Sequence, residues 1–180
     1  MRRFSYVTTR RLSDVVFDRQ LKKRQRSLCL NLQDSAYYDY LREESARQLV
    51  DRIEDITRKF PVALELGSYR GALAQHMKDL GVVDGKGCVG GIQQLIQCDV
   101  ATLPSANPPN PNSPSSDSPI ENYALQVDEE FLPFKEDSFD LVLSSLNMHW
   151  VNDLPSSLQQ VSRIDHMHHD SLLISEVTEH

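Results

Sequence analysis

One short segment, residues 62–77 (VALELGSYRGALAQHM), constrains the fold more than any other part of the chain. An apolar run that carries the acid Glu65 is followed by Gly67 and Gly71, and then by apolar residues at helical spacing. This pattern predicts a strand that turns into a helix, with glycines that let the backbone approach a nucleotide-type ligand. Tyr69 stands between these glycines, where a third glycine would be expected.

The rest of the chain alternates between the two kinds of element. Apolar residues recur every three or four positions over residues 38–60, which predicts a helix with Asp34 or Ser35 as its cap and Pro61 after its end. Further helices are predicted over residues 71–80 and 154–164, and strands over residues 92–100, 123–127, 138–146 and 171–177. This alternation predicts an α/β fold with a doubly wound, mostly parallel sheet.

The ends and one internal segment differ in composition from this pattern. Residues 1–13 contain four arginines and no acid, which is typical of a mitochondrial transit peptide or a disordered basic leader. We therefore divide the chain into a leader, a helical region, a partial α/β domain and a divergent tail. Their bounds are residues 1–16, 17–60, 61–164 and 165–180. Within the domain, the Pro-, Ser- and Asn-rich residues 101–122 are predicted to form a disordered insertion.

Charge and cysteine usage exclude several classes of protein. A formal net charge of -7 argues against the broad basic face of a nucleic-acid-binding protein. The basic run RQLKKRQR (residues 19–26) is more typical of a solvated helix face than of a binding patch. The three cysteines form no CxxC pair, and HMHH (residues 166–169) lacks a metal-ligand spacing, so no metal site is predicted.

Acidic residues lie at the ends of three of the predicted strands or directly after them. Glu65 lies in the first strand, Asp99 ends the second and Asp128 follows the third. In a doubly wound sheet a ligand lies at the carboxyl ends of the strands, where an acid after the second strand accepts hydrogen bonds from a ribose. The Asp128-Glu129 pair, with the apolar residues after it, suits an adenine. The alternative for each acid alone is an ordinary surface position.

The segment DEEFLPFKEDSFDLVLSSLNMHWVNDLP (residues 128–155) resembles the corresponding part of class I S-adenosylmethionine-dependent methyltransferases. Within that superfamily it is most similar to mitochondrial complex I assembly factors that act as protein-arginine hydroxylases. ELGSYRG stands where that family has DLGCGRG, and FDRQLKKRQR looks like its pre-domain helical region. The resemblance runs from about Phe17 to about Ile164.

This resemblance implies a Rossmann-like methyltransferase sheet that binds S-adenosylmethionine. It also implies a protein on the matrix side of the mitochondrial inner membrane, peripheral to that membrane, that helps to assemble respiratory complex I. Its partner would be a complex I subunit or assembly intermediate, on which it hydroxylates an arginine. Carried over by position, the cofactor residues are Glu65, Gly67, Gly71, Asp99, Asp128 and Glu129, and His149 and Trp150 match the segment that lines the substrate side.

The chain also departs from the family. Tyr69 replaces a glycine, and a positive φ there would cost about 1 kcal/mol or more, which argues against cofactor binding. After Ile164 the sequence DHMHHDSLLISEVTEH differs from the family's continuation, which predicts a shortened chain whose sheet lacks its C-terminal strands.

Other functions therefore stay open at this point. One is a methyltransferase that acts on a protein or small molecule, and another is a non-catalytic isoform that only binds partners. A nicotinamide-dependent dehydrogenase is disfavoured because the GxGxxG pattern is missing. The sequence contains no evident set of two histidines and a carboxylate for iron, so the catalytic residues stay unassigned.

Overall fold

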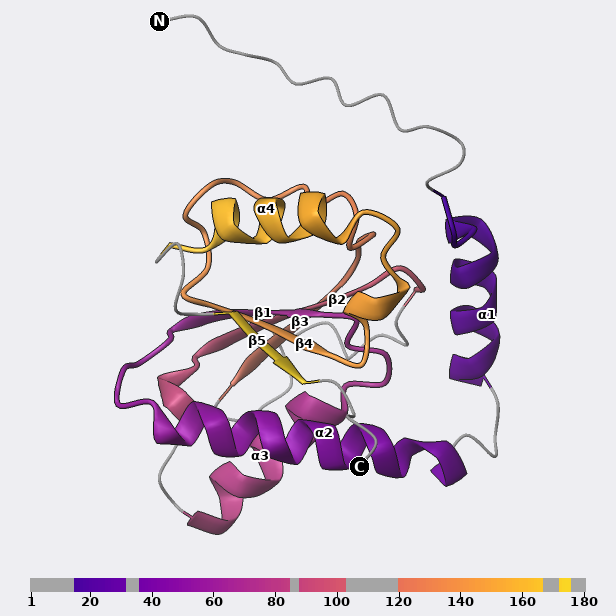
Figure 1. The fold of residues 1–180 in the computed structure, drawn as a ribbon. Coiled ribbons are helices and arrows are strands. Elements are labelled where there is room, and N and C mark those ends of the chain that lie inside the picture. Colours follow the sequence, from indigo (N-terminus) through magenta and orange to yellow (C-terminus); the bar gives the residue numbers. More distant parts are fainter. Residues whose placement is uncertain (1–14, 32–35, 85–87, 103–119, 167–171, 176–180) are drawn as a thin grey trace, which may run out of the picture.

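Five parallel strands form a single sheet in the order β3-β2-β1-β4-β5 (Figure 1). The computed structural model describes residues 15–31, 36–84, 88–102, 120–166 and 172–175. The first strand in the sequence, β1, lies at the centre of the sheet. β2 and β3 follow on one side of it, and β4 and β5 lie on the other, so the strand order reverses at a switch point between β1 and β4. The strands are β1 (Val62–Leu66), β2 (Gln94–Asp99), β3 (Glu121–Gln126), β4 (Leu141–Ser145) and β5 (Leu172–Ser175). The predicted doubly wound α/β fold is confirmed.

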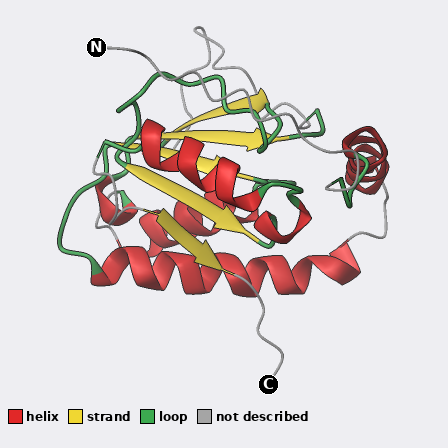
Figure 2. Cartoon of the chain, turned by 45° about the horizontal axis from the view of Figure 1, so that its top comes forward, coloured by secondary structure: helices red, strands yellow, loops and turns green. Residues whose placement is uncertain are grey.

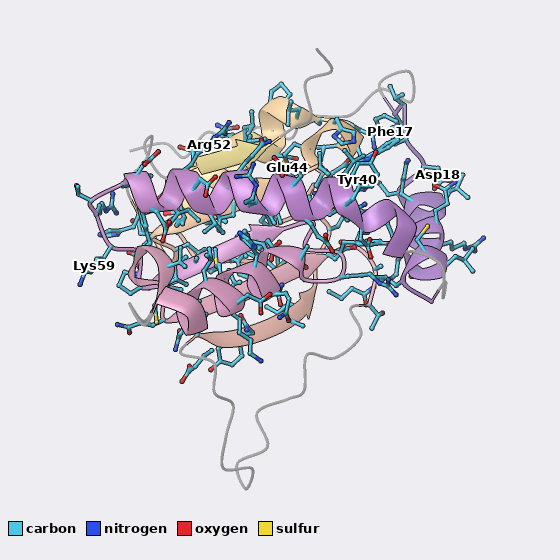
Figure 3. The ribbon with its side chains drawn as sticks, turned by 90° about the horizontal axis from the view of Figure 1, so that it is seen from below. Phe17, Asp18, Tyr40, Glu44, Arg52 and Lys59 are labelled. Carbon is cyan, nitrogen blue, oxygen red and sulfur yellow. The ribbon has the colours of Figure 1, made fainter. Side chains whose placement is uncertain are left out.

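Helices cover both faces of this sheet. α2 (Ala36–Asp55) and α3 (Ala72–Asp84) lie on one face and α4 (Leu154–Ile164) lies on the other (Figure 1). α1 (Arg19–Asn31) covers neither face but stands at the side toward which the strand arrowheads point (Figure 2). Phe17 and Asp18, at its start, lie near the end of α2 that carries Tyr40, whereas Lys59 lies at the opposite end (Figure 3). α1 therefore stands where a doubly wound sheet binds its ligand.

Two apolar clusters hold the layers together. One joins α2 and α3 to the sheet through side chains such as Leu49, Phe60 and Met77. The other joins α4 to the opposite face and includes Leu64 and Val161. The central strand β1 contributes to both clusters, which explains its nearly continuous apolar sequence, because a parallel strand covered on both faces needs apolar residues at every position.

The structure moves three of the boundaries expected from the sequence. α2 ends at Asp55, before Phe60, because Phe60 N donates to Gly90 O (2.9 Å) in the 3-10 turn η3 (Val89–Gly91). β3 begins at Glu121, inside the segment predicted to be disordered, and follows the buried Ile120. β5 lies within the predicted divergent tail and pairs in parallel with β4.

Several sequence predictions concern residues outside the described part of the chain. They are residues 1–14 of the basic leader, the helix caps Asp34 and Ser35, most of the insertion (residues 103–119), and His168 and His169 of the histidine-rich run. Within the described residues, none of the helices combines the length and the apolar composition needed to span a membrane.

Candidate functional site

The loop between β1 and α3 requires its two glycines. Gly67 and Gly71 have φ values of 76° and 77°, in the left-handed region that glycine tolerates best. Gly67 N and Ser68 N both donate to Cys98 O, at 2.8 and 3.0 Å, which ties the loop to the end of β2. A Cβ on Gly67 would lie 2.2 Å from Cγ of Asn147, so the end of β4 also packs against this loop.

Tyr69 adopts the positive φ considered in the sequence analysis, with a value of 52°. Its backbone N–H donates to Asp99 Oδ2 (3.1 Å), while its largely buried side chain packs with Leu30 and Ala101. The Arg42 guanidinium lies 3.9 Å from the centre of the ring. Burial and this cation–π contact offset the backbone strain, which explains how a non-glycine residue is accommodated here.

Asp99 lies fully buried at the end of β2, and its carboxylate accepts hydrogen bonds from three donor groups. Ala101 N donates to Oδ1 (2.9 Å), and Oδ2 accepts from Tyr69 N and from Arg26 Nη1, the latter at 2.5 Å. Arg26 Nη2 also donates to Asn147 Oδ1 (2.5 Å). The predicted ribose acid therefore lies beside the glycine loop, as the sequence order requires, but it faces an arginine from α1.

The second acidic group, Asp128 and Glu129, follows β3 and contacts another arginine of α1. Arg19 donates to both oxygens of Asp128, from Nη2 to Oδ1 (2.7 Å) and from Nε to Oδ2 (3.3 Å), and also to Glu129 Oε2. Burial lowers the pKa of Arg19, but its hydrogen bond to Asp128 and the negative charge of Glu129 outweigh this effect and raise the pKa. The guanidinium is thus firmly held in its charged form.

The basic run in α1 is not a solvated face, so that sequence prediction is wrong. Arg19, Lys22 and Arg26 recur at helical spacing and point toward the ends of the strands. Lys22 Nζ lies 3.1 Å from the centre of the Trp150 ring, and Phe17 meets the same ring edge-on at 5.4 Å. The spacing of the basic residues was the available signal, but their acidic partners lie too far along the sequence to be recognised from it.

Two buried polar atoms around these arginines have no hydrogen-bond partner. They are Glu129 Oε1 and Asn147 Nδ2. Arg26 Nη1 lies 3.9 Å from Glu129 Oε1, within ion-pair range but beyond a hydrogen bond. Buried polar groups nearly always have a hydrogen-bond partner. These two atoms, together with the carboxylate of Asp99, therefore form a set of donors and acceptors that fits a polar ligand such as a nucleoside.

Glu65 lies below the loop rather than at its surface. It is 3% exposed and accepts a hydrogen bond from Gln97 Nε2 (2.9 Å), and Gln97 in turn lies under Gly71. Burial raises the pKa of Glu65 to about 7, and the charge of Asp99 adds to this effect. The structure therefore brings Asp99, Asp128 and Glu129 around the two arginines and places Glu65 in the layer beneath the loop.

Replacement of Glu65 by glutamine is expected to remove a pH dependence of stability. The folded-state pKa of about 7 lies above the usual 4.5, so the unfolded chain loses this proton first as pH rises. The free energy of unfolding of the wild type then falls between pH 4.5 and 7, by about 3 kcal/mol. Urea unfolding across this range should show the wild type less stable than Glu65→Gln at about pH 8 and similar to it at about pH 4.5. Equal pH profiles would contradict this, and the exposed Glu54→Gln is the control.

His149 and Trp150 lie in the 3-10 turn η4 (Met148–Trp150) after β4. His149 is exposed, with its ring 4.9 Å from that of Trp150. Trp150 O accepts a hydrogen bond from Arg19 Nη1 (3.2 Å). The turn therefore borders the acidic groups, and the predicted place of these two residues on a substrate side stays a prediction.

A separate cavity of about 520 Å³ lies between the first turns of α3 and the start of α2. It shares Arg70 and Gly71 with the glycine loop, but Asp99, Asp128 and Glu129 do not line it. We therefore take the group of acids at the strand ends, rather than this cavity, as the candidate site and call it the acidic crevice: Asp99, Asp128, Glu129 and Asn147, closed by Arg19 and Arg26 of α1.

These features define an α/β protein with a doubly wound parallel sheet, in which a glycine loop and strand-end acids lie beside the switch point. Residues 64–166 match the protein family described as "Methyltransferase domain", which covers more than half of the chain. The chain belongs to this methyltransferase-domain family.

Curated relatives are similar over most of this chain. It is 41% identical over 150 residues to a Danio rerio protein named arginine-hydroxylase NDUFAF5, mitochondrial, which covers 83% of this chain and 41% of the relative. The Homo sapiens protein of the same name is also 41% identical, over 83% of this chain and 38% of its own length. The chain therefore spans about two fifths of these relatives.

Solved structures agree on the fold. The N-methyltransferase NodS from Bradyrhizobium japonicum, in complex with S-adenosyl-L-homocysteine, superimposes with a TM-score of 0.55 at 14% identity. The match covers 79% of this chain and 67% of NodS. At this level of identity the likeness concerns the architecture of the domain.

Proposed function

We propose that this chain binds S-adenosylmethionine in the acidic crevice. The observation that carries this proposal is the buried carboxylate of Asp99 at the end of β2, directly beside a glycine loop in a methyltransferase domain. Asp99 would accept the ribose hydroxyls, and Asp128 with Glu129 would border the adenine. Gly67 and Gly71 keep the loop free of side chains at its two tight bends.

We further propose that the whole protein helps to assemble mitochondrial respiratory complex I by hydroxylating an arginine of one of its subunits. The names of the relatives at 41% identity, which describe a mitochondrial arginine-hydroxylase, support this reaction. The arginine-rich, acid-free leader supports a mitochondrial location, for which we propose the matrix, at the periphery of the inner membrane. The partner is then a complex I subunit or assembly intermediate.

Methyl transfer is the second candidate reaction, and the methyltransferase-domain match favours it. Bound S-adenosylmethionine would supply an electrophilic methyl group for that reaction. The two reactions leave different marks on an arginine. Hydroxylation adds one oxygen atom and would need dioxygen as the oxidant, with a two-electron reductant to convert the second oxygen atom to water. Methylation adds one CH₂ unit.

Two measurements test the proposed function. Calorimetric titration of the purified chain with S-adenosylmethionine should show binding with a dissociation constant in the micromolar range, and the absence of binding would refute the cofactor assignment. Mass spectrometry of complex I subunits, from cells without the protein and from cells in which it is restored, should show an arginine that gains one oxygen only when the protein is present. A gain of CH₂ instead would establish the methyltransferase.

A further inference from the structure

We propose that α1 is a latch on the acidic crevice, in which Arg26 and a bound nucleoside exclude one another at Asp99. Binding of an adenosyl compound would then release α1 from the strand ends. This inference rests on the proposed function, since it requires the crevice to take a nucleoside.

The number of acceptor positions on Asp99 carries the first step. Each carboxylate oxygen has two lone pairs. Oδ2 already accepts from Tyr69 N (3.1 Å) and Arg26 Nη1 (2.5 Å), and Oδ1 accepts from Ala101 N (2.9 Å). A ribose diol that binds both oxygens needs one open position on each of them. The backbone donors belong to the loops themselves, so Arg26 is the donor that has to leave.

Arg26 also fills the crevice incompletely. It pairs with Asn147 Oδ1 but leaves Asn147 Nδ2 and Glu129 Oε1 buried without a hydrogen-bond partner. An unsatisfied buried polar group destabilises the folded state. A ligand with donors and acceptors around its rim satisfies such atoms better than a single guanidinium, which has no acceptor of its own. A bound ligand could therefore replace the hydrogen bonds that Arg26 of α1 donates to Asp99 and Asn147.

Charge, more than apolar packing, holds α1 in place. Arg19 and Arg26 contact the acids, whereas Leu21 and Leu28 on the same helix are 50% and 68% exposed. Leu30 is the one buried leucine of α1, in a small cluster with Tyr69 and Ala101. Without α1, Asp99 and Glu129 would lose the guanidinium of Arg26, whose Nη1 lies 2.5 Å from Asp99 Oδ2 and 3.9 Å from Glu129 Oε1, and two neighbouring carboxylates without a cation repel one another. S-adenosylmethionine carries a positively charged sulfonium group, so it would replace part of the positive charge that α1 withdraws.

Trp150, the single tryptophan of the chain, reports on this contact. Its ring is covered by Lys22 and Phe17, both of which precede or belong to α1. Asn152 secures the same end, because it accepts from Phe17 N (2.7 Å) and donates through Nδ2 to Phe17 O (3.0 Å). Release of α1 would expose the indole to water.

The experiment uses the full chain and S-adenosylhomocysteine, which binds without turnover. Arg26→Gln is expected to bind it about tenfold more tightly than the wild type, because the competing charge-assisted pair is lost. Arg24→Gln is the matched control, since it makes the same charge change on the exposed side of the same helix, and its affinity should equal that of the wild type. Circular dichroism checks that each variant is folded.

Trp150 fluorescence provides a second measurement. Addition of S-adenosylhomocysteine to the wild type should shift the emission to the red and increase quenching by acrylamide, and Arg26→Gln should show part of this change without ligand. Equal affinities of wild type and Arg26→Gln, with unchanged Trp150 emission on binding, would overturn the latch while leaving the cofactor assignment intact. Failure of every variant to bind would refute both proposals.

Discussion

Asp99→Ala is expected to weaken binding of S-adenosylhomocysteine by about 100-fold or more. The carboxylate would accept two hydrogen bonds from the ribose, and each charge-assisted bond contributes about 1.5–3 kcal/mol. No other acid occupies the end of β2, and Asp99 is completely buried, so solvent cannot replace it. Isothermal titration calorimetry of the wild type and the variant provides the measurement.

The controls for this prediction separate binding from folding. Asp99→Asn keeps the size of the side chain and one acceptor for Tyr69 N or Ala101 N, and it should also lose most of the affinity. Asp51→Ala removes an exposed acid from α2 and should bind like the wild type. Urea unfolding followed by Trp150 fluorescence shows whether each variant is folded. An affinity of Asp99→Ala within about threefold of the wild type would remove Asp99 from the cofactor site.

Gly67→Ala is expected to lower the free energy of unfolding by about 3 kcal/mol or more. The residue needs a φ of 76°, and its new Cβ would lie 2.2 Å from Cγ of Asn147. Asn147 would have to move, and with it the partner of Arg26 Nη2. The variant should therefore lose both stability and the shape of the crevice, as measured by urea unfolding and by calorimetric titration.

Gly71→Ala is the matched control for this effect. Its φ of 77° is nearly the same, but its Cβ would first meet the flexible end of Gln97, at 3.2 Å. Gly71→Ala should therefore show the cost of the backbone conformation without the severe contact. Asn147→Gly in the background of Gly67→Ala removes both Cγ and Cβ of Asn147, which would lie 2.2 and 2.5 Å from the new Cβ, and it should recover part of the lost stability. Equal losses in the two glycine variants would show that Asn147 does not limit this position.

The elements that were predictable from the sequence are those whose evidence is local. The apolar run, the two glycines and the following helix appear within residues 62–77, and the order of elements then determines that the ends of β1, β2 and β3 meet at one edge. The positions of Asp99 at the end of β2 and Asp128 after β3 were predictable for this reason. Their placement needs only the strand that precedes each acid and no knowledge of side-chain contacts.

The contacts made by α1 were not predictable in this way. Arg26 meets an acid 73 residues away and Arg19 meets one 109 residues away, and a basic helix has the same local pattern whether it faces water or acids. Tyr69 shows the opposite difficulty. From the sequence, its side chain is expected to obstruct the approach of a ligand to the glycine loop. In the structure the ring points toward α1 and α2, where it contacts Leu30 and Arg42.

The docking of α1 on side chains from three strand ends also has a consequence for the order of folding. Asp99, Asn147 and Glu129 come together only when β1 has paired with β2 and β4 and β2 has paired with β3, which requires contacts between distant parts of the chain. α1 therefore has no complete binding surface until the sheet has formed, and we expect it to be the last helix to dock. In the native state we expect it to be the first helix to open, because it is attached mainly by ion pairs and shares only the small cluster of Leu30, Tyr69 and Ala101 with the rest of the domain.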